Sequence, residues 1–100
     1  MEFTGHAKFD RAARIRYIVE TIGVGNVVKE HKQENYMGEQ WACLTDTGVM
    51  IIKDLAREKV ITMFVATLSQ AMKVYQSRRL PNEIYNTVRG NYEVWKNQPI

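Results

Sequence analysis

The chain has 100 residues, of which 45% are hydrophobic and 25% charged, and its formal net charge is +3. This composition is typical of an ordinary globular protein, and the length predicts one domain, residues 1–100, with a single core. No stretch approaches the roughly 20 apolar residues of a membrane span, and the first residues lack the apolar centre of a signal peptide. We therefore expect a cytoplasmic protein without membrane contact, and the charge permits a nucleic-acid partner without requiring one.

The N-terminal part predicts an amphipathic helix over residues 11–22. Residues 3–7 suit a short edge strand or an extended lead-in, and Asp10 is a plausible N-cap. One apolar stripe follows at helical spacing, formed by Ile15, Ile18, Val19 and Ile22. Arg11 and Arg14 are three residues apart and are predicted to project together, away from that stripe. The glycines at 23 and 25 are expected to end the helix.

The middle of the chain predicts an antiparallel meander. Residues 27–32 are compatible with an edge strand or another helical turn, and we favour the strand; residues 33–39 indicate a loop. Residues 40–67 then indicate three short strands joined by two turns. The first turn, 46–48, ends in Gly48 and suits a three-residue hairpin loop. The second turn has no glycine, and a two-residue turn at 56–57 would place Asp54 opposite Lys59.

The last of these strands, residues 60–66, is apolar on both faces, which is typical of a central strand covered on both sides. Thr62 is its polar interruption. Two interpretations stay open for this residue: a threonine selected for its β propensity, or a hydroxyl that faces a functional site.

Two helices are predicted after the strands. Thr67 and Gln70 match a capping box, so the first helix begins there, and it is expected to end at Arg79. Pro81 interrupts the pattern, and Asn82 is a candidate cap for a last helix with an apolar and aromatic stripe. The predicted fold class is therefore α+β: an N-terminal helix, a three- to four-stranded antiparallel meander and two C-terminal helices.

His6 is the residue with the clearest chemical potential, because histidine titrates near neutral pH and is the commonest general acid or base. It precedes a cluster of four cations, Lys8, Arg11, Arg14 and Arg16. Cations beside a histidine can hold a phosphate and stabilise the charge of a transition state. The plainer alternatives are a partly buried histidine that bonds to backbone and a solvated basic helix face.

Metal and cofactor chemistry is not expected. His6 and His31 are far apart in the sequence, and Cys43 is the single cysteine, so no zinc-ligand spacing is present. The sequence also has no glycine-rich phosphate loop and no nucleophile elbow.

The order of these features resembles a known family. The sequence Phe3-Thr4-x-His6-Ala7, a basic helix and a meander ending in Val-Ile-Thr-x-Phe resemble small members of the Barnase–EndoU–colicin–RelE superfamily of metal-independent ribonucleases, many of them toxins or phage-borne. The similarity covers residues 3–67. It implies His6 as acid/base, Arg11 or Arg14 on the scissile phosphate, and Thr62 near the 2′-hydroxyl or the phosphate.

Two functional hypotheses follow. The first is a phage- or toxin-type RNase-like domain that cleaves RNA without metal, with His6, Arg14 and Thr62 as catalytic residues and Lys8, Arg11 and Arg16 as nucleic-acid-binding residues. RNA and a cognate inhibitor protein are its expected partners. The second is a non-enzymatic phage or mobile-element accessory protein that binds a protein or a nucleic acid, with a homodimer through the C-terminal aromatic helix as one form.

Overall fold

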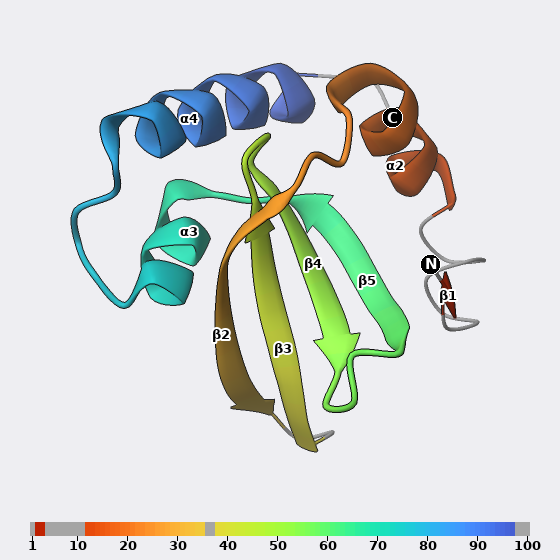
Figure 1. The fold of residues 1–100 in the computed structure, drawn as a ribbon. Coiled ribbons are helices and arrows are strands. Elements are labelled where there is room, and N and C mark those ends of the chain that lie inside the picture. Colours follow the sequence, from red (N-terminus) through yellow and green to blue (C-terminus); the bar gives the residue numbers. More distant parts are fainter. Residues whose placement is uncertain (1, 4–11, 36–37, 98–100) are drawn as a thin grey trace.

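A five-stranded sheet with the strand order β1-β5-β4-β3-β2 forms the centre of the molecule (Figure 1). The structure, a computed structural model, describes residues 2–3, 12–35 and 38–97. The strands are β1 (Glu2–Phe3), β2 (Val27–Asn35), β3 (Gly38–Thr45), β4 (Val49–Asp54) and β5 (Lys59–Val65). The helical elements are α2 (Ala12–Tyr17), the π-helical segment η1 (Ile18–Ile22), α3 (Leu68–Tyr75) and α4 (Asn82–Lys96). The α+β class and the antiparallel meander of four strands, β2 to β5, are confirmed.

Helices cover both faces of this sheet and divide the core into two clusters. On one face, α3 and α4 pack on alternate strand residues, including Leu44 and Met50, and on Ala66, which follows β5. On the other face, Ile18 of η1 packs with the intervening residues, including Cys43 and Met63. Figure 1 shows α4 lying across the end of the sheet, and its residues contribute to both clusters. The α4 helix therefore links the two layers.

The N-terminal helical segment confirms the predicted element but not every part of its apolar stripe. Ile18 is fully buried, whereas the side chain of Val19 is 53% exposed. The segment changes from α- to π-helical geometry at Ile18, and the N–H of Gly23 donates to the carbonyl of Ile18 at 2.7 Å. The wider π turn alters the angular spacing of the following residues, so an α-helical pattern misplaces Val19. Of the short edge strand or lead-in expected at residues 3–7, Phe3 belongs to β1. Residues 4–7 and the predicted cap at Asp10 lie outside the described residues.

The polar stretch that was predicted to be a loop is mostly strand. The strand favoured at 27–32 is confirmed as the start of β2, but β2 continues to Asn35, and β3 begins at Gly38. The ladder includes Gln33 opposite Gln40 and Glu34 opposite Glu39. Apolar alternation is absent here because β2 is the outer strand of the meander, where backbone pairing forms without a buried side-chain row.

β5 lies between β4 and β1 in the sheet, and its residues pack in the clusters on both faces, as predicted. Among the described residues, β1 runs parallel to it along Lys59 and Val60. The ladder to β4 also contains a bulge, because Ile52 pairs with Thr62 and Lys53 pairs with Val60, which leaves Ile61 as an extra residue. Lys53 opposite Val60 has the offset that places Asp54 opposite Lys59, as predicted, and the Lys59 N–H donates to the Asp54 carboxylate at 2.9 Å. The bulge moves Val60 to the face of Met63 and Ile61 to the face of Phe64.

The turn between β3 and β4 confirms the predicted hairpin chemistry. Gly48 has a φ of 81°, and a Cβ at this position would lie 3.2 Å from the Cα of Val88 in α4. The hydroxyl of Thr47 donates to the carbonyls of Gly23 and Val24 at 2.7 and 2.9 Å, and Asn91 of α4 donates to the carbonyl of Thr47. This turn therefore joins η1, the sheet and α4.

The C-terminal helices begin and end differently from one another. The capping box is confirmed: the N–H of Gln70 donates to the Thr67 hydroxyl at 3.1 Å, and the Thr67 N–H donates to the Gln70 side chain at 2.9 Å. The helix ends at Tyr75 rather than 79, because Gln76 adopts a left-handed conformation with a φ of 53°. Asn82 is the first residue of α4, and Pro81 occupies the cap position, so the predicted Asn82 cap is wrong.

Candidate functional site

Two of the three predicted catalytic residues, Arg14 and Thr62, are in contact. Arg14 projects from α2 over the outer edge of β5, where its Nη2 donates to the Thr62 hydroxyl at 3.0 Å and its Nε donates to the Met63 carbonyl at 3.1 Å. Its guanidinium carbon also lies 5.9 Å from the centre of the Phe64 ring. The helical pattern predicted that Arg14 would project away from the apolar stripe. The side chain instead bonds to β5 and fixes α2 to the sheet edge.

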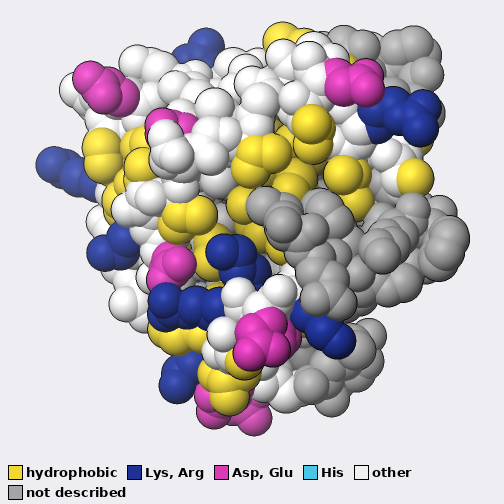
Figure 2. All heavy atoms as spheres, turned by 45° about the vertical axis from the view of Figure 1, so that its right-hand side comes forward, with side chains coloured by type: hydrophobic (Ala, Val, Ile, Leu, Met, Phe, Trp, Pro, Cys, Tyr) yellow, Lys and Arg dark blue, Asp and Glu magenta, His cyan; other side chains and the backbone are white. Residues whose placement is uncertain are grey.

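The Arg14–Thr62 contact lies in a hollow of about 380 Å³. Figure 2 turns the right-hand side of Figure 1 forward and shows hydrophobic side chains gathered over the middle of that surface. Two aromatic residues of α4, Tyr92 and Trp95, line the hollow together with Phe64 of β5. Trp95 packs on Tyr17 of α2, with ring centroids 5.2 Å apart. A fixed cation, a hydroxyl and aromatic rings thus meet at one place.

The other predicted site residues are distributed differently. His6, Lys8 and Arg11 lie outside the described residues. Arg16 is exposed on α2. Before residues 4–11, the backbone of Phe3 pairs with Val60 of β5. After them, Arg14 bonds to β5 through the contacts given above. The chain on both sides of His6 therefore meets the same strand.

A row of directly opposed residues crosses the sheet from β2 to the Arg14 contact. His31 pairs with Ala42, Ala42 with Ile52, and Ile52 with Thr62, so the four side chains lie on one face. Neighbouring strands are about 4.8 Å apart, so the row spans about 14 Å. Its two middle residues, Ala42 and Ile52, are buried in the core with residues of α3, whereas His31 and Thr62 at its ends are partly exposed.

Three hollows follow this row and share their lining residues. Gln70 of α3 lines all three. The hollow of about 380 Å³ shares Phe64 with a central one of about 180 Å³. The central hollow shares His31 and Lys73 with the largest, of about 650 Å³, which Arg78 also lines. Because they share these residues, we call the three neighbouring hollows together the trough.

The lining of the trough is basic. Its cationic residues are Arg14 at one end and Lys73 and Arg78 at the other, with His31 beside them. None of the described residues that line the three hollows is Asp or Glu. Lys73 and Arg78 form no ion pair with any described residue. The trough therefore combines positive charge with neutral hydrogen-bonding groups such as Gln33 and Gln70.

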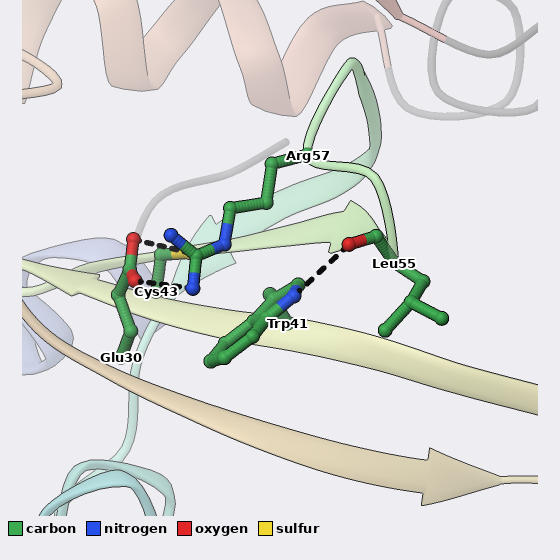
Figure 3. Close-up of polar contacts among 5 residues, drawn as sticks. All are labelled: Glu30, Trp41, Cys43, Leu55 and Arg57. Carbon is green, nitrogen blue, oxygen red and sulfur yellow. Dashed lines mark hydrogen bonds and ion pairs between the residues drawn. The ribbon is translucent and has the colours of Figure 1, made fainter.

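The opposite face of the same strands is closed by the β4–β5 turn (Figure 3). Arg57 from this turn stacks on Trp41, with its guanidinium carbon 3.8 Å from the ring centre, and pairs with Glu30 at 3.2 Å. The Cys43 thiol donates to Glu30 at 3.7 Å. Burial raises the pKa of Cys43, and the charge of Glu30 raises it further. This cysteine is consequently a protonated, buried thiol at neutral pH.

Within residues 2–3, 12–35 and 38–97, no group of three His, Cys, Asp or Glu side chains is arranged to hold a metal ion. In the same ranges, no helix has both the length and the apolar character needed to cross a membrane. No family model, curated protein or solved structure matches the chain.

The sequence interpretation missed the residues that form the far end of the trough. Gln70 and Lys73 are three residues apart on α3, a spacing that places them side by side on one helix face. That spacing was the signal in the sequence from which a polar face of α3 could have been predicted. The opposing residue, His31, could not be matched to them because the start and length of β2 were uncertain.

Proposed function

We propose that this protein is a metal-independent ribonuclease whose site includes His6, Arg14 and Thr62. The contact between Arg14 and Thr62 is the observation that carries the proposal, because these residues are 48 positions apart in the sequence. The family resemblance implied a role at the phosphate for Arg11 or Arg14 and a role near the 2′-hydroxyl or the phosphate for Thr62. The cationic trough that begins at this contact adds further support, since an RNA backbone is a chain of negative charges.

The proposed reaction is attack of the RNA 2′-hydroxyl on the adjacent phosphorus. A base removes the 2′-hydroxyl proton while the 2′-oxygen forms a bond to phosphorus and the bond to the 5′-oxygen breaks. The leaving 5′-oxygen takes up a proton, which gives a 2′,3′-cyclic phosphate and a free 5′-hydroxyl. His6 is the group of this site that exchanges protons near neutral pH.

Arg14 and Thr62 have different roles in this proposal. The charge of Arg14 offsets the negative charge that develops on the phosphate oxygens in the transition state. The hydroxyl of Thr62 both accepts from Arg14 and offers a hydrogen bond near the 2′-hydroxyl or the phosphate. A group that is already fixed before the substrate arrives stabilises charge with little reorganisation, which is the condition for strong electrostatic catalysis.

The test is cleavage of total RNA and of tRNA by purified protein in excess chelator. We expect cleavage to survive chelation and to produce cyclic phosphate ends. His6→Ala is expected to slow the reaction by about 10²- to 10⁴-fold, the usual contribution of general acid–base catalysis. Arg14→Ala is expected to slow it by about 10²- to 10³-fold.

Arg89→Gln is the matched control for Arg14, because it removes a positive charge from an exposed position of α4 that lines none of the three hollows. Thr62→Val keeps the shape of the side chain and removes the hydroxyl. Circular dichroism and thermal unfolding establish that each variant is folded. Absence of cleavage by the folded wild type at high concentration would sink the proposal.

A second function, binding without catalysis, is favoured by one observation. Arg14 bonds to a strand carbonyl and a strand hydroxyl, and those contacts stabilise the packing of α2 on β5 whether or not any reaction occurs. In that case the protein is an accessory protein that binds a nucleic acid or another protein. A folded wild type that binds RNA but leaves it intact would select this function.

A further inference from the structure

The outer side of the meander presents a backbone edge. β2 is the last strand in the sheet order, and among the described residues it pairs only with β3. Figure 1 shows β2 at the border of the sheet with α3 beside it. At nine residues it is the longest of the described strands. An edge of this length leaves a row of N–H and C=O groups that can pair with another extended chain.

The largest hollow, of about 650 Å³, lies along this strand. It is lined by His31 of β2 and otherwise by residues between Ser69 and Arg78, from α3 and the chain that follows it. No described residue of β3, β4 or β5 lines it, whereas the central hollow reaches inward to Ala42 and Ile52. The largest hollow is therefore bounded by the outermost strand of the meander on one side and by α3 on the other.

The two faces of β2 differ in charge. Lys29, His31 and Gln33 alternate along the strand and share the face that α3 covers. The acidic residues of β2, Glu30 and Glu34, are on the opposite face, where the first is already paired with the β4–β5 turn. On the α3 side, the exposed edge of β2 therefore presents basic and neutral side chains alone.

The helix side of the hollow has the same sign of charge. Lys73 and Arg78 line it and form no ion pair with any described residue. Lys29 reaches the end of α3, with its ammonium 5.8 Å from the centre of the Tyr75 ring. None of the described residues that line this hollow is Asp or Glu. An entering carboxylate therefore meets positive charge from both the strand and the helix, and it breaks no described ion pair.

We infer that β2 and α3 form a docking site for an acidic segment of another protein, which adds to the outer edge of β2 as an extra strand. Main-chain hydrogen bonds to the edge hold the segment, and pockets for alternate side chains give specificity. Alternate residues of a strand point to one face at intervals of about 6.7 Å, so a segment with acidic alternate residues directs its carboxylates toward Lys73 and Arg78. This site is separate from the Arg14–Thr62 contact and does not depend on RNA cleavage.

A second copy of the chain fits this edge poorly. Antiparallel pairing of two β2 strands around a twofold axis keeps like faces together, so Lys29 and His31 of both copies would gather on one face beside Lys73. Like charges on neighbouring strands destabilise the pairing. Carboxylates at the same positions of the added strand reverse the sign of that interaction, which favours a different, acidic partner.

The experiment uses synthetic peptides as the probe, because they separate side-chain charge from backbone pairing. The labelled peptide Thr-Glu-Thr-Glu-Thr-Glu-Thr, blocked at both ends, combines the β propensity of threonine with carboxylates on a single face. Its control, Thr-Thr-Glu-Glu-Glu-Thr-Thr, has the same composition and charge but places carboxylates on both faces. Fluorescence anisotropy measures the affinity of each, and the alternating peptide is expected to bind more tightly.

Backbone pairing is tested with two N-methylated versions of the alternating peptide, one methylated on the glutamates and one on the threonines. Alternate N–H groups of a strand point to opposite edges, so each version blocks one edge of the peptide. One version should lose affinity by about tenfold or more, because several main-chain hydrogen bonds are lost, while the other should bind like the unmodified peptide.

The protein variant is Lys73→Gln/Arg78→Gln, and its charge-matched control is Lys59→Gln/Arg89→Gln, at exposed positions that line none of the three hollows. Loss of two exposed ion pairs should weaken binding of the alternating peptide by about 3- to 30-fold. The control should change it by less than about twofold, because salt screens distant charges. Thermal unfolding establishes that both variants are folded.

Equal affinity for the two peptide sequences, or for both methylated versions, would overturn the inference. A labelled single-stranded 2′-O-methyl oligonucleotide, which has no 2′-hydroxyl to attack, tests the rival occupant. If Lys73→Gln/Arg78→Gln weakens single-strand binding but leaves peptide binding unchanged, the hollow takes a nucleic acid and the inference is wrong. A wild type that sediments as a dimer and does not bind the alternating peptide would show instead that a second copy covers the edge.

Discussion

The two faces of the sheet differ in whether their cationic side chains are paired with other groups of the protein. On the face closed by the β4–β5 turn, Arg57 lies between Trp41 and Glu30, and its charge is paired within the protein. On the trough face, Lys73 and Arg78 have no such partner among the described residues, and no lining residue is acidic. Cations of the same kind thus serve the fold on one side and are available to a ligand on the other.

This difference separates stability from binding in a way that single substitutions can test. A paired surface cation contributes modestly to the free energy of unfolding, and its loss should not alter what the opposite face binds. An unpaired cation in a depression contributes little to folding, and its loss should alter binding alone. Variants that affect both properties therefore indicate an element shared by the two faces.

Gly48→Ala is expected to have the largest effect, because α4 is that shared element. A left-handed φ costs a residue with a side chain about 1–2 kcal/mol, and crowding in a packed core costs about 1–3 kcal/mol more. The new Cβ would lie 3.2 Å from the Cα of Val88. We expect the free energy of unfolding in urea to fall by about 2–5 kcal/mol.

The same variant should also weaken oligonucleotide binding, since Tyr92 and Trp95 of α4 line the trough. Gly90→Ala is the matched control: it lies in the same helix, and a Cβ there meets nothing within 4 Å. We expect it to be neutral or slightly stabilising because alanine favours a helix. Equal destabilisation by both substitutions would show that the turn does not fix α4.

Arg57→Ala is the next largest change and should affect stability alone. An exposed cation–π contact contributes about 0.5–1 kcal/mol, and a partly exposed ion pair contributes up to about 1 kcal/mol. We expect a loss of about 0.5–2 kcal/mol in chemical unfolding with unchanged affinity for single strands. Arg57→Lys keeps the charge without the planar guanidinium, so its stability should be intermediate. Weaker oligonucleotide binding in either variant would break the separation of the two faces.

The sequence predicted the features that short-range chemistry determines. Gly48 identified the first hairpin, and Thr67 with Gln70 identified the start of α3, because each depends on neighbours within a few residues. The second turn contains no glycine, and Arg57 adopts a φ of 61° there. Its contacts with Trp41 and Glu30 come from other strands, so neither this turn nor the bulge at Ile61 could be predicted locally.

The candidate site was predictable in part for the same reason. The basic cluster and the family resemblance indicated Arg14, and the resemblance indicated Thr62, yet the helical pattern predicted that Arg14 would point away from the core. The side chain bonds instead to β5, where the Met63 carbonyl and the Thr62 hydroxyl accept from its guanidinium. The far end of the trough depends on the register between His31 and Ala42 and on the position of α3 over the sheet. Those are long-range features that no local pattern encodes.

Asp54→Ala should reduce stability by about 1 kcal/mol. The carboxylate of Asp54 accepts from the N–H groups of Glu58 and Lys59 at 2.8 and 2.9 Å, and these bonds hold the turn that presents Arg57. Their exposure keeps the net contribution near that of an average hydrogen bond. Chemical unfolding measures the loss, and Trp41 fluorescence should change as its stacking partner moves. The double variant Asp54→Ala/Arg57→Ala should lose less stability than the sum of the losses in the two single variants, because both residues act through one turn.

The smallest expected effect concerns Cys43 and appears only in alkaline solution. The folded pKa of this thiol is raised by burial and by Glu30, so its contribution to stability is constant below the pKa of the unfolded thiol. As the pH rises above that value, the unfolded chain ionises first, and stability falls until the folded pKa is passed. The decline in unfolding free energy between pH 7 and 10 should therefore be shallower in Cys43→Ala than in the wild type.

The native thiol should also react slowly with iodoacetamide at pH 8. If the protein is alkylated after partial unfolding and is then refolded, unchanged single-strand binding would show that the trough face is independent of Cys43. A thiol that reacts at the rate of the unfolded chain would show that the face closed by Arg57 opens readily in solution.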